Sequence, residues 1–230
     1  MHKFASLKHL LGMLLLYFVG YLILLPTLMT RFTLMIHPSA THFHPLVLLL
    51  GYFVYTLILM IFTYKIWKKS FYQSMSQLKQ HFMLILKSSI FILIVNGVLS
   101  IVIGFIFQSS GSSNQQEIQQ QSFLYPNLTL FITCVIAPMI EEMIFRSSFF
   151  ECDFLKRYPT FTLWISSLLF GWIHVMDSLF SIGLSELGYF FIYTMIGLVL
   201  GYSYQRSQSL FVCIFIHAIN NVIACMIMYS

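Results

Sequence analysis

The feature of this sequence that most limits its fold is a series of long apolar segments with few charges inside them. The segments cover Leu10–Met29, Leu46–Tyr64, Phe82–Phe107, Leu128–Phe150, Phe161–Met176, Leu187–Tyr204 and Leu210–Met228. A helix needs roughly 20 mostly apolar residues to cross a bilayer, and inside the bilayer it satisfies its own backbone hydrogen bonds. We therefore expect an all-α, polytopic transmembrane helical bundle with about seven spans, within a range of six to eight.

Polar composition points to the same environment. Charged residues make up 8% of the 230 positions, whereas an ordinary soluble domain has ~25%. So few charges cannot cover the surface of a water-soluble globule, which excludes a cytosolic enzyme, a disordered chain and a nucleic-acid-binding protein. We expect a lipid bilayer around the protein and no nucleic-acid partner. The 4 cysteines lie in or beside apolar segments and are expected to be buried free thiols.

The positions of Lys and Arg predict the orientation of the spans. When the N-terminus is placed in the cytoplasm and the crossings are counted, all of the 12 basic residues except Arg31 fall on the cytoplasmic side. Cytoplasmic loops of membrane proteins carry an excess of Lys and Arg, so this count supports the orientation. Short loops without organelle signals favour a bacterial plasma membrane.

No soluble domain interrupts the apolar segments, so we expect residues 1–230 to form a single integral-membrane domain. Asn114–Gln121 is a Gln-rich, low-complexity stretch and is expected to be an exposed flexible loop. Gly197 and Gly201 form a GxxxG pair, which allows a neighbouring helix to approach closely.

Two adjacent carboxylates lie inside the fourth apolar segment. Glu142 and Arg146 are four residues apart and share one helix face, so we expect them to form an ion pair. Glu141 points ~100° away from Glu142 and lacks that cation, which makes it the candidate for a general base. Pro138 can open the helix just before the two acids. The structural alternative is that both acids flank the cytoplasmic membrane edge.

Polar side chains also lie in the fifth and seventh apolar segments. His174 could be a catalytic residue, or a core histidine that pairs with Asp177 one turn later. His217 and Asn221 are four residues apart and project from one face, where they could donate hydrogen bonds to an oxyanion. Asn220 is a near alternative, and hydrogen bonding between helices is the structural one. One carboxylate, two histidines and an amide on three helices indicate a site for hydrolysis.

In order and spacing, these motifs resemble those of the CPBP family, the CAAX-protease and bacteriocin-processing intramembrane proteases, also called the Abi family. The matching residues are Glu141, Glu142 and Arg146, then Phe170 and His174, then His217 and Asn221. The resemblance covers residues 126–230, which we expect to form the catalytic core. The first three spans match only in being apolar.

The resemblance implies a role for each of these residues. Glu141 would activate water with the help of His174. His217 and Asn221 would form the oxyanion site. Supporting residues would be Glu142, Arg146 and Phe170. Substrates would be membrane-protein segments or leader peptides that can enter a site within the membrane.

The resemblance leaves the use of a metal open. We favour a glutamate mechanism without a cofactor, because the sequence has no HExxH motif. The alternative is a catalytic Zn²⁺ held by Glu141, His174 and His217, which would supply a carboxylate and two imidazoles.

At ~1.5 Å per residue, His174 would lie deeper than Glu141 and His217 unless the fifth helix tilts or begins below the membrane surface.

A non-catalytic membrane scaffold or bacteriocin-immunity protein would keep the fold but not need Glu141. A transporter would use buried acids and histidines to carry protons, although an internal repeat would then be expected.

Overall fold

The computed structural model describes residues 6–109, 111–179 and 183–228, which form helices and turns without a β-strand. Among these residues, 6 helices are long and apolar enough to span a membrane. They are Leu7–Ile36, Pro45–Phe62, Leu78–Phe107, Pro126–Ser148, Leu184–Ser207 and Leu210–Met228. The apolar helix α9 (Pro159–Ile173) is shorter, at 15 residues. The all-α polytopic bundle is confirmed, with this short helix at the place of the predicted fifth span.

The first two spanning helices form an antiparallel pair. The first consists of α1 (Leu7–Leu15), the π-helical segment η1 (Leu16–Leu24) and α2 (Leu25–Ile36), and α3 (Pro45–Phe62) returns beside it. A π-helical turn shifts the backbone hydrogen-bond register, and the Tyr55 hydroxyl donates to the Leu16 carbonyl at 2.8 Å. This bond joins α3 to the start of the π-helical segment.

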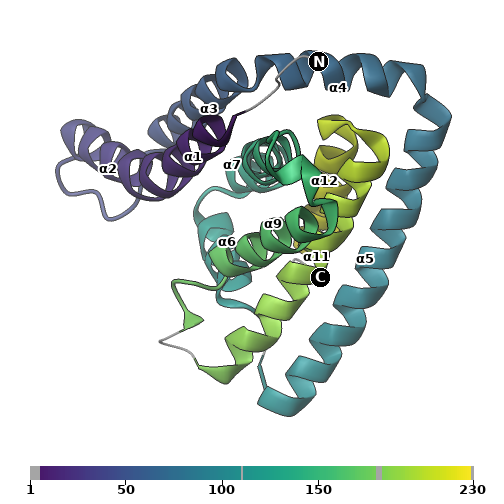
Figure 1. Cartoon of the computed structure of the whole chain (residues 1–230). Coiled ribbons are helices and arrows are strands. Elements are labelled where there is room, and N and C mark those ends of the chain that lie inside the picture. The colour runs from purple at the N-terminus through teal and green to yellow at the C-terminus, as the bar shows by residue number, and fades with distance from the viewer. Residues whose placement is uncertain (1–5, 110, 180–182, 229–230) are drawn as a thin grey trace.

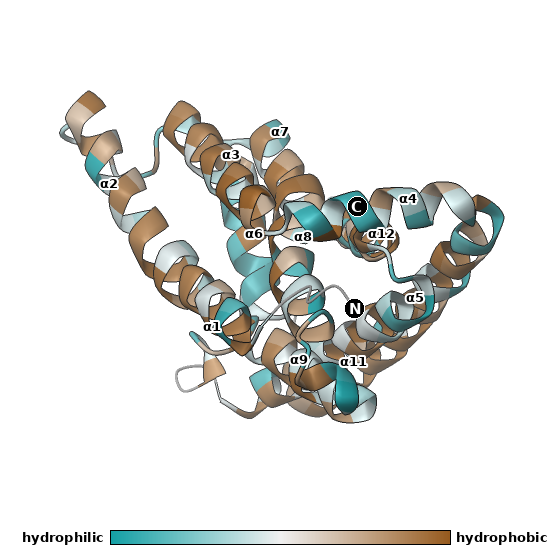
Figure 2. Cartoon of the chain, turned by 45° about the horizontal axis from the view of Figure 1, so that its top comes forward, coloured by the Kyte–Doolittle hydropathy of each residue, from teal (hydrophilic) through white to brown (hydrophobic). Residues whose placement is uncertain are grey.

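Two helices carry the chain around the bundle. α4 (Tyr64–Ser76) crosses from α3 to α5 (Leu78–Phe107), so that α1–α3 and α5 flank different sides of the central helices (Figure 1). The spanning helices are mostly hydrophobic, while α4 mixes polar and apolar positions (Figure 2). Lys69 of α4 lies 2.7 Å from Glu151 in the turn before α9, which attaches α4 to the central helices.

The Gln-rich stretch forms a helix, α6 (Ser113–Leu124), and the prediction of a flexible loop is wrong there. The Ser112 side chain caps this helix by accepting from the Gln115 backbone N–H at 3.2 Å, as serine does at many helix starts. Glutamine is a good helix former, and Glu117 bonds to Gln121 one turn later. The prediction of a loop rested on the low-complexity composition alone, which gives no information on the cap or on this side-chain pair.

The central helices carry the three motifs. The fourth spanning helix is built of α7 (Pro126–Phe131), η2 (Ile132–Ile136), α8 (Ala137–Glu142) and η3 (Met143–Ser148). After a turn that includes the 3₁₀ helix η4 (Leu155–Arg157), the chain continues through α9, α11 (Leu184–Ser207) and α12 (Leu210–Met228).

The GxxxG pair lies where α9 and α11 pack together. A Cβ added at Gly197 would lie 3.0 Å from Ser167 Cα, and one added at Gly201 would lie 2.6 Å from Leu163 Cδ1. The prediction of a close helix contact is therefore confirmed. The partners in α9 run backwards as α11 advances, which makes the two helices antiparallel.

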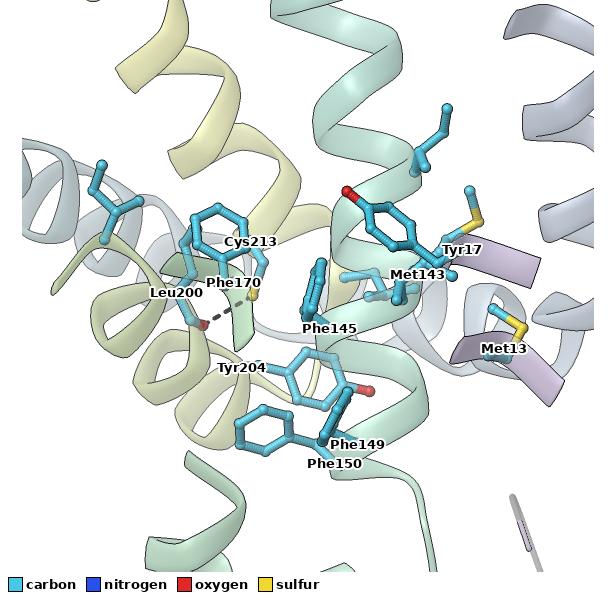
Figure 3. Packing of buried hydrophobic residues seen from close by; sticks show 14 of the residues in the cluster. Met13, Tyr17, Met143, Phe145, Phe149, Phe150, Phe170, Leu200, Tyr204 and Cys213 are labelled. Carbon is cyan, nitrogen blue, oxygen red and sulfur yellow. Dashed lines mark hydrogen bonds between the residues drawn. The ribbon is translucent and has the colours of Figure 1, made fainter. Parts of the chain in front are cut away.

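Aromatic residues fill the core beneath the motifs. Phe145 is fully buried, with Tyr17 at 5.5 Å on one side and Phe170 at 5.6 Å on the other, both in edge-to-face contact (Figure 3). On the other side of this cluster, Cys213 donates to the Leu200 carbonyl (Figure 3). Buried aromatic pairs of this kind add to the free energy gained from burial alone, and they fix the helices that carry the polar residues. All 4 cysteines are buried and free, as expected.

Candidate active site

Both acidic residues of the first motif lie inside the protein. Glu141 and Glu142 end α8, between the π-helical segments η2 and η3. The exposed fraction is 8% for Glu141 and zero for Glu142. Both acids are therefore enclosed by the protein. π-helical turns occur often at functional sites because they redirect side chains within a helix.

Glu142 and Arg146 form the predicted ion pair. The Arg146 Nε lies 2.9 Å from Glu142 Oε2, and both side chains are completely buried. A second guanidinium nitrogen donates to the Ser166 hydroxyl at 2.9 Å, which in turn donates to the Phe145 carbonyl. The pair therefore joins the acid-bearing helix to α9.

Phe170 packs against the ionisable side chains of the site. The Arg146 guanidinium lies 5.2 Å from the centre of the Phe170 ring, within the range of a cation–π contact. The His174 ring lies 4.6 Å from the same ring, and the His217 ring 5.6 Å. One aromatic ring thus contacts a residue of each of the three motifs, in agreement with a supporting role.

His174 is held by its backbone contact and by stacking. Its Nδ1 lies 2.7 Å from the Phe170 carbonyl, which can only accept, so Nδ1 donates the hydrogen bond. The ring also stacks on Tyr193 of α11, with 4.4 Å between centres. The remaining nitrogen, Nε2, lies 3.6 Å from Glu141 Oε2. Asp177, the expected alternative partner, is exposed.

His217 contacts both acids. Its Nδ1 lies 3.0 Å from Glu142 Oε1, and its Nε2 lies 3.9 Å from Glu141 Oε2. Since the Glu142 carboxylate already pairs with Arg146, it accepts from Nδ1 and directs Nε2 towards Glu141. The three residues expected to share the chemistry therefore converge despite their predicted difference in depth.

Glu141 Oε2 is the point on which the two imidazoles converge. Within the described part of the chain this oxygen is buried and accepts no hydrogen bond. A separation of 3.6 or 3.9 Å is longer than a direct hydrogen bond. A base with an unpaired oxygen, next to two imidazole nitrogens, has the geometry to take a proton from a water molecule held among them.

Asn221 lies near this cluster but is bound to the backbone. It donates from Nδ2 to the Thr133 carbonyl at 2.9 Å, which leaves the second hydrogen of the same amide group. Asn221, Asn220, Glu141, His174 and His217 all line one cavity of about 420 Å³. The cavity brings the candidate oxyanion donors to the same space as the candidate base.

The same cavity contains residues that the sequence analysis missed. Asn96 of α5 lines it, as does Tyr193, whose hydroxyl contacts Ser112 at 2.8 Å beside the start of α6. Polar side chains of α6, including Gln115 and Gln121, line it too. An amide inside an apolar span is a signal of function that could have identified Asn96.

The donor types at the cluster are chemically suited to zinc. Each imidazole uses Nδ1 for a hydrogen bond and keeps Nε2 for another partner, as zinc-binding histidines do. Among residues 6–109, 111–179 and 183–228, no three His, Cys, Asp or Glu side chains are grouped closely enough to hold a metal ion.

The three motifs all lie in one segment of the chain that matches a known protein family. Residues 123–223 match the family model of type II CAAX prenyl endopeptidase Rce1-like proteins. A Bacillus subtilis (strain 168) protein, putative membrane peptidase YdiL, is 29% identical over 110 residues, which make up 48% of this chain and 41% of that relative. The chain thus aligns with less than half of the relative's length. No solved structure matches the chain significantly.

Proposed function

We propose that this chain, whose resemblance to the CPBP family these matches confirm, is an intramembrane endopeptidase. It hydrolyses peptide bonds of membrane-associated segments or leader peptides. The observation that carries the proposal is the buried Oε2 of Glu141, which has no hydrogen-bond partner among the described residues and lies 3.6 and 3.9 Å from the Nε2 atoms of His174 and His217.

In the proposed mechanism, a water molecule binds between Glu141 and His174. Glu141 Oε2 takes one proton from the water, and the oxygen attacks the carbonyl carbon of the substrate. The His174 Nε2 accepts a hydrogen bond from the other O–H of the water and so orients it, because its Nδ1 is fixed on the Phe170 carbonyl. Glu141 then gives its proton to the leaving nitrogen, so that the base returns to its starting state.

The negative charge that develops on the substrate oxygen needs donors. Asn221 supplies the second hydrogen of its Nδ2, and His217 supplies an N–H from Nε2 when its ring is protonated. Donors that are fixed before the reaction stabilise an oxyanion strongly.

A zinc mechanism is the alternative at the same residues. Glu141, His174 and His217 would hold the ion only after moving closer together than they lie among the described residues, and the ion would then act as a Lewis acid on water. We favour the mechanism without metal because the sequence lacks the HExxH arrangement. If activity disappears with a zinc chelator and returns with added Zn²⁺, the zinc alternative is correct.

The setting of the site defines the class of substrate. Its cavity lies among apolar helices with the length of membrane spans, so a substrate must itself enter the bilayer or its edge. We also propose a bacterial plasma membrane with the N-terminus in the cytoplasm. A cysteine placed at Gln77 should then react with an impermeant maleimide only after the inner membrane face is opened.

The activity can be tested before the substrate is identified. Peptide termini are compared in membrane and secreted fractions of source cells that carry wild type or Glu141→Gln at matched protein abundance. Termini that appear only with wild type support the peptidase and identify its substrates. Identical termini in both strains would contradict it and favour a scaffold or immunity function.

A further inference from the structure

Three asparagine side chains form a chain of hydrogen bonds along the cavity. Asn96 Nδ2 of α5 donates to Asn220 Oδ1 at 3.0 Å. Asn220 Nδ2 donates to Asn221 Oδ1 at 3.2 Å, and Asn221 Nδ2 donates to the Thr133 carbonyl at 2.9 Å. All four residues line the cavity that contains Glu141. The chain of amides therefore connects α5 to the proposed oxyanion donor.

The Thr133 carbonyl fixes the direction of the whole chain. A backbone carbonyl can only accept, so the Asn221 amide must direct its nitrogen to Thr133 and its oxygen to Asn220. Asn220 must then direct its own oxygen to α5. Asn96 completes the chain only if it donates its nitrogen there.

This direction leaves the Asn96 oxygen without a partner. Within the described residues, Asn96 Oδ1 is buried and forms no hydrogen bond. A buried acceptor without a donor is unfavourable for folding, and an apolar residue of the same shape would suit the apolar helix α5 better. Stability alone does not explain an asparagine at this position.

We propose that Asn96 is a positioning residue that acts through Asn220 to orient Asn221, an inference that rests on the proposed function. By occupying Asn220 Oδ1, it keeps Asn220 Nδ2 on Asn221 Oδ1 and the nitrogen of Asn221 on Thr133. The second Nδ2 hydrogen of Asn221 then has a fixed direction towards the substrate oxygen. Asn96 lies outside residues 123–223, the segment that matches the family model.

Two substitutions of similar shape separate the possible roles. Asn96→Leu removes the donor and also the unpaired acceptor. Asn96→Asp, when ionised, offers only acceptors, so that Asn220 must turn its nitrogen towards α5 and its oxygen towards Asn221. Asn221 Nδ2 is then drawn away from Thr133. We expect the aspartate variant to be the more damaging of the two.

The experiment measures kcat, KM and thermal unfolding of purified protein in bilayer nanodiscs. The probe is an internally quenched peptide that covers a cleavage site found in the comparison of termini. Loss of one oxyanion donor costs about 10²- to 10³-fold in kcat. We expect Asn96→Leu to lower kcat by about tenfold, which is part of that effect, and Asn96→Asp to approach the full loss. KM and the unfolding temperature of Asn96→Leu should stay close to wild type.

Two further variants test whether Asn96 acts through Asn221. In an Asn221→Ala background, Asn96→Leu should have no additional effect on kcat, because coupled residues are not additive. The matched control is Ser89→Ala, which removes another buried polar atom of α5 that has no partner among the described residues, and it should leave kcat unchanged.

The outcomes separate this inference from the proposed function. A wild-type kcat in Asn96→Leu, additive effects with Asn221→Ala, or a kcat loss matched by a lower unfolding temperature would overturn the positioning role alone. If wild type and Glu141→Gln give the same cleavage products, the peptidase proposal fails and this inference fails with it.

Discussion

Glu142 contacts two of the other ionisable side chains of the site, one with each carboxylate oxygen. One carboxylate oxygen binds Arg146 at 2.9 Å and the other binds His217 at 3.0 Å. Removing two ions from water costs several kcal/mol for each ion, so this arrangement is a poor way to gain stability alone. Its geometric effect is to hold the His217 ring with Nε2 towards Glu141, which agrees with a supporting role in the proposed mechanism.

Arg146→Met should destabilise the protein strongly. The substitution leaves the buried Glu142 without its main counter-charge, and loss of one partner of a buried pair costs roughly 3–5 kcal/mol. Denaturant unfolding in detergent micelles measures the change. The double variant Glu142→Gln, Arg146→Met should recover much of the lost stability, and an unchanged midpoint for Arg146→Met would contradict the importance of the pair.

For single residues, the sequence predicts the contacts that local spacing can determine. The pairing of Glu142 with Arg146 follows from a separation of four residues on one helix. The contact between His217 and Glu142 joins residues 75 positions apart, and spacing gives no information on such a contact. For the same reason the chain of amides that starts at Asn96 could not be predicted.

At the element scale, the contact of α9 with α11 positions His174. Gly171 lies close to Thr194 and to the Phe190 carbonyl of α11. His174 follows about one turn later, directly after the end of α9. The lack of side chains at this contact lets the helices approach, and the His174 ring reaches Tyr193 for stacking. A GxxxG pair predicted close packing but not which helix would be the partner, because many helices could fit it.

Gly197→Ala should weaken both stability and activity. The added Cβ would lie 3.0 Å from Ser167 Cα and 3.1 Å from its carbonyl oxygen, so the backbones of α9 and α11 must move apart. Overpacking of this kind costs typically about 1–3 kcal/mol. Thermal unfolding and peptide cleavage measure the two effects.

Gly12→Ala is the matched control for this substitution. In the part of the chain that the structure describes, no atom lies within 4 Å of a Cβ added at Gly12 in α1, and alanine is the better helix former. The control should unfold at the wild-type temperature or slightly above it. Equal effects of the two substitutions would contradict the importance of the contact.

On the scale of the whole molecule, a charged cluster ties the peripheral helix α4 to the central helices. The buried Glu151 lies 2.7 Å from both Lys69 and Lys156 and accepts from the Tyr204 hydroxyl at 2.8 Å. Burial by itself would raise the pKa of Glu151, but the hydrogen bonds and charges of Lys156 and Lys69 outweigh it and hold the pKa below its usual range.

The lowered pKa predicts a loss of stability in acid. A carboxyl whose pKa is lower in the folded state stabilises the fold above its unfolded pKa of about 4.3, and this contribution disappears as the pH falls through the folded value. The unfolding temperature of wild type should fall over that range more steeply than that of Glu151→Gln. Glu117→Gln, at an exposed position, is the control, and parallel curves for wild type and Glu151→Gln would contradict the role of the cluster.

Sequence patterns predict the membrane bundle as a whole better than its internal connections. Long apolar segments are sufficient to predict spanning helices, because a bilayer admits few alternatives. They do not predict that α4 is a separate helix or that α6 lies over the cavity, since both depend on caps and on contacts with distant residues such as Glu151 and Tyr193. The three motifs predict the members of the cluster, and the fold brings Glu141, His174 and His217 together.

The role of Glu141 as the base can be tested with purified wild type and Glu141→Gln in bilayer nanodiscs. Both are incubated, with and without a zinc chelator, with a synthetic peptide that spans a cleavage site identified in cells. We expect wild type to cleave it in both conditions and Glu141→Gln to be slower by at least about 10²-fold, the lower end of what a general base contributes. Cleavage by Glu141→Gln at the wild-type rate would show that Glu141 is not the base.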